Sequence, residues 1–81
     1  MANNDAPAVM AIVEPALVTA GIPLLGWEVL TTTNQIKVDA GWPENDNTFE
    51  IRTLLNGSSN DADLAGLIIE TLVYYFFPPE Q

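Results

Sequence analysis

The fold of this chain is decided by residues 24–40, LLGWEVLTTTNQIKVDA. Apolar and polar side chains alternate at both ends of this stretch, a pattern typical of β-strands that bury one face. We expect a first strand over 24–33, whose inward side chains are Leu25, Trp27, Val29 and Thr31. A second strand is expected over 35–40, whose inward side chains are Ile36, Val38 and Ala40.

A short turn over residues 32–34 joins the two strands as a hairpin. A two-residue loop at Thr32 and Thr33 would place Glu28 opposite Lys37, and opposite charges on facing strands favour that register. Residues 41–47 are rich in turn formers, and alternation resumes over 48–55 with Phe49, Ile51 and Thr53 on one face. The hairpin is therefore predicted to extend into a three-stranded meander.

Helices are expected on either side of the strands. The first runs over 6–20, with Asp5 as its N-cap and Gly21 just after its end. Pro15 lies inside it and predicts either a kink near Ala11 or a division into two short helices. Asn60 or Asp61 can cap the last helix, and Pro78-Pro79 ends it.

Together these elements predict one domain over 1–81, with 1–5 and 78–81 flexible. Its class is α+β, a two-layer sandwich in the order α-β-β-β-α, in which two helices cover a three-stranded antiparallel meander. This order resembles that of the double-stranded RNA-binding domain. That family depends on basic residues at the start of its last helix, whereas residues 60–63 here are Asn-Asp-Ala-Asp. The resemblance is one of topology, and we infer no membership from it.

The composition excludes several classes of function. Hydrophobic residues make up 48% of the 81 residues and charged ones 16%, so the chain is expected to fold. Eleven acidic residues face only two basic ones, Lys37 and Arg52, and the net charge is −9. Direct binding to nucleic acid requires Lys and Arg against phosphates and is not expected. Cysteine is absent, which excludes disulfides and thiolate metal sites.

The expected location is the cytoplasm, or the host cell cytoplasm if a phage encodes the chain. Residues 1–5 have neither the basic nor the apolar region of a signal peptide. The longest apolar stretch, Leu64 to Phe77, spans 14 residues, whereas a helix that crosses a membrane needs about 20. We therefore expect no membrane association.

Catalytic chemistry has little support in the sequence. The chain contains neither His nor Cys, so Ser58 and Ser59 have no imidazole to activate them. Lys37 is interpreted as an ion-pair partner on a strand. Asp39, Glu44 and Asp46 are close enough in sequence to suggest a cation-dependent enzyme, but their spacing does not match a known calcium loop. We predict a non-enzymatic protein without metal or cofactor, and the carboxylate enzyme remains one alternative.

Two surfaces are candidates for binding. Carboxylates that point outward from the sheet, or that lie in the loop between its second and third strands, would form an acidic array: Glu28, Asp39, Glu44, Asp46 and Glu50. Trp42, at the start of that loop, is either a binding anchor or a lid on the core. The last helix has a second apolar line beside its core stripe, which is either buried or a site of self-association: Ile69, Val73, Tyr74 and Phe77.

The leading hypothesis is a non-enzymatic acidic protein-binding domain. In this hypothesis a small bacterial or phage inhibitor imitates nucleic-acid phosphates and occupies a basic site on a partner protein, and it forms a homodimer through its last helix. The alternative is a structural or adaptor protein, such as a virion component or a chaperone-like module, that assembles through the apolar last helix.

Overall fold

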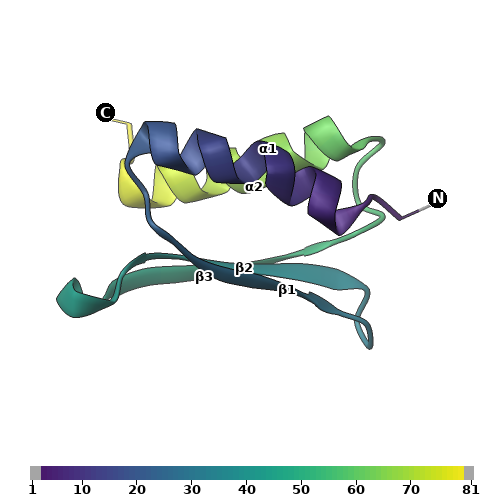
Figure 1. Ribbon diagram of the computed structural model, residues 1–81, viewed down its shortest axis with the longest axis horizontal. Coiled ribbons are helices and arrows are strands. Elements are labelled where there is room, and N and C mark those ends of the chain that lie inside the picture. Colours follow the sequence, from purple (N-terminus) through teal and green to yellow (C-terminus); the bar gives the residue numbers. More distant parts are fainter. Residues whose placement is uncertain (1–2, 80–81) are drawn as a thin grey trace.

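The computed structural model describes residues 3–79 and has the predicted α+β class and the order α-β-β-β-α. Two helices pack on one face of a three-stranded antiparallel sheet, and the opposite face is uncovered (Figure 1). A short 3-10 helix, η1, connects the second and third strands. The elements are α1 (Ala6–Ala20), β1 (Leu24–Leu30), β2 (Gln35–Trp42), η1 (Pro43–Asn45), β3 (Asn47–Leu54) and α2 (Asp61–Phe76).

The register of the hairpin confirms the sequence prediction, because Glu28 pairs with Lys37 across β1 and β2. β1 ends at Leu30, so the connection is the four-residue segment 31–34 rather than a two-residue loop. Asn34 has a φ of 56°, a left-handed conformation that asparagine tolerates well. A register shift between Leu24 and Gly26 turns Leu25 outward, so its predicted inward position is wrong.

The β2–β3 connection is shorter than predicted. β2 continues through Gly41 to Trp42, which pairs with Asn47 at the start of β3. Gly41 has a φ of 122°, and its backbone lies close to Thr48. Gly41 and Trp42, which the sequence placed in the turn, are thus part of the sheet. Glycine at position 41 allows β3 to approach closely, which a side chain would prevent.

α1 is a single helix through Pro15, so the alternative of two short helices is wrong. Ala11 and Pro15 both lie on the exposed side of α1, where water can donate a hydrogen bond to the Ala11 carbonyl that proline leaves without a donor. Asp5 is the N-cap, as predicted, but its side chain makes no capping hydrogen bond. In α2 the side chain of Asn60 accepts a hydrogen bond from the Asp63 N–H at 2.8 Å.

The core lies between the sheet and the two helices, which run side by side in the same direction (Figure 1). Its largest fully buried side chains come from α1, β2 and α2: Val9, Met10, Val13, Leu17, Ile36, Val38, Leu64, Ile68 and Leu72. Trp27 is half-buried and packs against this core, as predicted. No charged side chain among residues 3–79 is buried, so every charge described below is at the surface.

Residues 3–5, which we expected to be flexible, make hydrogen bonds to distant segments. The Asn4 N–H donates to the Leu55 carbonyl at 2.8 Å, and its side chain donates to the Ser58 carbonyl at 3.0 Å. The Asp5 N–H donates to Asp61 Oδ1 at 3.0 Å, which joins the N-terminal ends of the two helices. Residues 1–2 and 80–81, the outer parts of the predicted flexible termini, lie outside the described residues.

Candidate protein-binding surfaces

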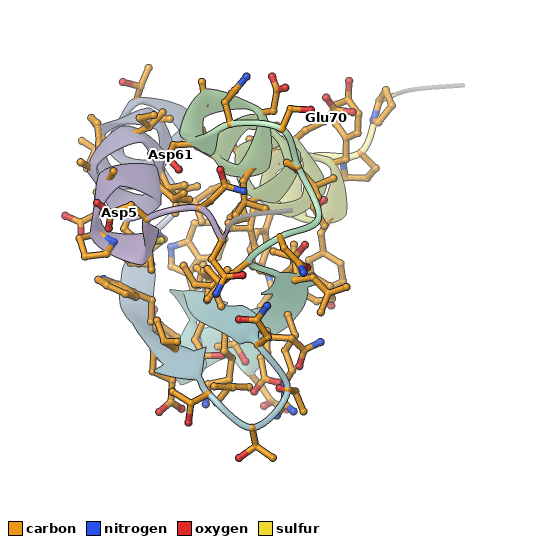
Figure 2. The ribbon with its side chains drawn as sticks, turned by 90° about the vertical axis from the view of Figure 1, so that its right-hand side faces the viewer. Asp5, Asp61 and Glu70 are labelled. Carbon is orange, nitrogen blue, oxygen red and sulfur yellow. The ribbon has the colours of Figure 1, made fainter. Side chains whose placement is uncertain are left out.

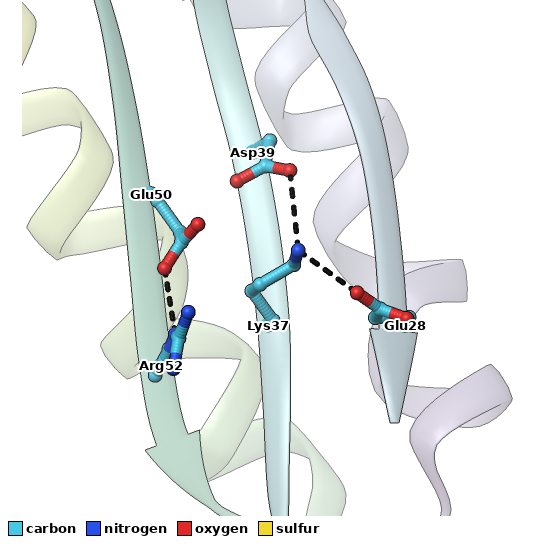
Figure 3. Close-up of polar contacts among 5 residues, drawn as sticks. All are labelled: Glu28, Lys37, Asp39, Glu50 and Arg52. Carbon is cyan, nitrogen blue, oxygen red and sulfur yellow. Dashed lines mark hydrogen bonds and ion pairs between the residues drawn. The ribbon is translucent and has the colours of Figure 1, made fainter. Parts of the chain in front are cut away.

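The uncovered face of the sheet bears five charged side chains, which we call the sheet-face charges: Glu28, Lys37, Asp39, Glu50 and Arg52 (Figure 3). Lys37 Nζ lies 2.8 Å from Glu28 Oε1 and 4.0 Å from Asp39 Oδ2. Arg52 Nε donates to Glu50 Oε2 at 2.6 Å. Both basic residues of the chain are therefore on this face, and they pair with the three carboxylates predicted to bind a partner.

The cross-strand order of these charges is unusual, because like charges are neighbours. Lys37 is directly opposite Arg52, and Asp39 is directly opposite Glu50. Such facing pairs destabilise a sheet when nothing compensates them. Here the ion pairs along and between the strands offset the repulsion, and they leave the face with one positive row beside one negative row.

The Glu28–Lys37 pair shifts the pKa values of both groups. The hydrogen bond from Lys37 is the main cause that lowers the pKa of Glu28 below its ordinary value of 4.5. The same hydrogen bond raises the pKa of Lys37 above its ordinary value of 10.5. The pair thus contributes stability in full between these two ordinary values. That contribution is lost as the pH falls through the lowered pKa of Glu28 or rises through the raised pKa of Lys37.

Replacing Glu28 with Gln is expected to lower the melting temperature slightly at about pH 7, and the difference should be smaller at about pH 3, because the contribution of the pair is lost as the pH falls through the lowered pKa of Glu28. Thermal denaturation of both proteins at the two pH values measures this effect. Glu44→Gln is the matched control, because Glu44 forms no ion pair among the described residues. A deficit in Glu28→Gln that is equal at both pH values would show that the ion pair is not its cause.

The helix layer, which we define as α1 with its N-cap and α2, has acidic residues and no basic ones. We call the five the helix-layer acids: Asp5, Glu14, Asp61, Asp63 and Glu70. Asp5 and Asp61 lie close together at the N-terminal ends of the helices, and Glu70 projects from the outside of α2 (Figure 2). Within the described part of the chain none of the five forms an ion pair.

Sequence reasoning did not place the helix-layer acids in the candidate site. The available signal was the position of Lys37 and Arg52. Both lie in the strands, so the only charged residues of the helical segments are acidic. Of the predicted acids, only Glu44 and Asp46 remain without a cationic partner among residues 3–79. Both are exposed in the β2–β3 connection, where Asp46 has a φ of 54°.

Trp42 lies at the end of β2 and packs against the end of α2. Its ring meets the ring of Phe76 edge-on at a centroid distance of 5.3 Å and that of Phe77 at 6.4 Å. The side chain is half-buried and contacts the core. These contacts favour the interpretation of Trp42 as a lid over that of a binding anchor.

The four residues predicted for self-association differ in burial. Ile69 and Val73 are partly buried and pack against the core, whereas Tyr74 is 55% and Phe77 50% exposed. Two other α2 residues, Leu67 and Tyr75, are exposed to about the same extent, and the Tyr75 ring stacks on Phe49 of β3 at 4.1 Å. Apart from Leu67, these exposed apolar residues lie at the C-terminal end of α2 or, for Phe77, just beyond it.

Residues 3–79 contain no cavity and no cluster of His, Cys, Asp and Glu side chains suited to a metal ion. Neither helix in this part of the chain is long and apolar enough to cross a membrane. Asp39, Glu44 and Asp46, considered above for a cation-dependent enzyme, are not brought together into a cation site.

Comparisons with models of protein families, with curated proteins and with solved structures find no match to this chain. The proposed function therefore rests on the geometry and the charge of the molecule.

Proposed function

We propose that this chain is a non-enzymatic protein-binding domain whose helix-layer acids contact a basic surface on a partner protein. One observation supports it above all others. The sheet-face charges include both cations of the chain, whereas the helix layer has five carboxylates and no cation. Such a one-signed surface attracts a basic partner and increases its association rate.

This proposal moves the binding surface away from the sheet. A basic partner that approached Glu28, Asp39 or Glu50 would have to compete with Lys37 and Arg52, which already pair with them. A partner that approached the helix layer would meet no such competition. Glu44 and Asp46 follow β2 at the end of the molecule away from Asp5 and Asp61 (Figure 1), and they can extend the acidic surface there. The proposed partner is a protein that uses its basic site to bind nucleic acid.

A neutralised helix layer provides the test. The triple variant Glu14→Gln, Asp63→Asn and Glu70→Gln is expected to lose the basic proteins that the wild-type chain captures from a lysate of its native host. The control is Glu28→Gln, Asp39→Asn and Glu50→Gln, which changes the net charge by the same amount and should retain them. Capture lost only in the sheet-face control would contradict the proposal.

A second candidate function is that of an adaptor that assembles through α2. The exposed aromatic side chains Tyr74, Tyr75 and Phe77 at the end of α2 support it, because exposed aromatic residues are enriched at protein interfaces. In this case capture would be unaffected by either set of carboxylate changes and would be lost in Tyr74→Asp.

A further inference from the structure

The two edges of the sheet differ in how accessible they are to another strand. β1 and β3 are the edge strands, and β1 contains the register shift between Leu24 and Gly26. Bulges of this kind discourage pairing at an edge. β3 pairs regularly with β2 along its whole length, and no other described segment makes backbone hydrogen bonds to the stretch from Thr48 to Thr53. β3 is therefore the edge open to a further strand.

The charged rows of the sheet face end at this edge. The positive row, Lys37 and Arg52, ends at Arg52, and the negative row, Asp39 and Glu50, ends at Glu50. Ile51 lies between the two ends on the strand. Both end residues are substantially exposed, with 53% of the Arg52 side chain and 41% of the Glu50 side chain accessible. A strand added here would meet one positive and one negative position, two residues apart.

β3 itself has the sequence that fits these positions. If a second copy of β3 pairs antiparallel about a two-fold axis at Ile51, Glu50 of each chain lies opposite Arg52 of the other. Residues that face each other in this way have Cβ atoms about 5 Å apart, which is within reach of an ion pair. The contact within one chain uses Arg52 Nε and Glu50 Oε2, so the other guanidinium nitrogens and Glu50 Oε1 remain for the second chain. The positive row of each chain then continues into the negative row of the other, and the two-fold axis makes this contact twice.

We propose that this chain forms a homodimer by antiparallel pairing of its β3 strands about Ile51. The dimer has one continuous sheet with three strands from each chain. It brings the two chains, each with a net charge of −9, together at the sheet, where two cations face three carboxylates. This interface differs from the self-association through the last helix that the sequence predicted, and it does not depend on the proposed function.

Charge exchange at positions 50 and 52 tests the proposal with the chain alone. Sedimentation equilibrium from about 1 μM to about 1 mM covers the affinities of small interfaces. The wild-type chain should dimerise within this range, and Glu50→Arg or Arg52→Glu should each weaken dimerisation at least about tenfold. An equimolar mixture of the two variants should form a heterodimer, because one chain then has two cations opposite two carboxylates of the other.

Misfolding does not explain such a result. Glu50→Arg places an opposite charge across from Asp39, and Arg52→Glu places one across from Lys37, so each variant improves a facing pair within its own sheet. Circular dichroism confirms the fold. A wild-type chain that stays monomeric throughout, or a mixture that associates no better than its components, would overturn the proposal. So would a dimer that tolerates both charge changes but is lost in Phe77→Asp, since that dimer would form through α2.

Discussion

Replacing Gly41 with Ala is expected to destabilise the fold by more than about 3 kcal/mol, a large part of the roughly 4–12 kcal/mol typical of a domain this size. Gly41 has a φ of 122°, which side-chain-bearing residues rarely adopt. An added Cβ would also lie 2.8 Å from the Thr48 Cα and 2.9 Å from Phe76 Cζ. Because Thr48 is met at its backbone, the strain cannot be relieved by a change of rotamer.

Urea denaturation of the variant measures this loss, and Gly66→Ala is the matched control. Gly66 lies inside α2, and a Cβ added there would meet nothing within 4 Å. Alanine is favoured over glycine in a helix interior, so this control is expected to gain about 1 kcal/mol. If Gly41→Ala unfolds at the same urea concentration as the wild type, the close approach of β2, β3 and α2 described here is wrong.

Trp42→Ala is expected to cost about 2–4 kcal/mol, because the indole packs against the core and against two aromatic rings at the end of α2. Thermal denaturation followed by circular dichroism measures the loss. Phe77→Ala is a useful comparison, since that side chain is 50% exposed and its removal should cost less than about 1 kcal/mol.

The same variant separates the two interpretations of Trp42. If Trp42 is a lid, the variant is destabilised, and below its melting temperature it still binds the partner. If Trp42 is a binding anchor, the variant keeps its melting temperature and loses the partner. The second result would contradict the structural role inferred from the Trp42–Phe76 contact.

The sheet was predictable from the sequence because alternation fixes which side chains face inward. That pattern, with the attraction between Glu28 and Lys37, was enough to place β1 and β2 in register. The ends of the strands were not predictable. Thr31 and Thr33 suit a strand but lie in the turn. Gly41 and Trp42 suit a turn but lie in β2, because they pair with Thr48 and Asn47 of β3 and Gly41 approaches α2.

The candidate site was predictable only in part. The alternation correctly placed Glu28, Asp39 and Glu50 on the outward face of the sheet, but their neutralisation depends on the alignment of three strands. The helical spacing of apolar residues predicted a second apolar line on α2. Two of its residues, Ile69 and Val73, pack against the core, because α1 lies beside α2. Burial of a helix on a second side is a tertiary property that its own spacing does not contain.

The salt dependence of partner binding tests the role of the helix-layer acids most directly. Once a partner has been captured, its affinity for the wild-type chain is measured between about 50 mM and about 500 mM salt, a range over which screening removes most attraction between exposed charges. The wild-type affinity should fall at least about tenfold. The variant Glu14→Gln, Asp63→Asn and Glu70→Gln should bind weakly at low salt and show little further change. Tight binding that depends neither on salt nor on these three carboxylates would contradict binding through the helix layer.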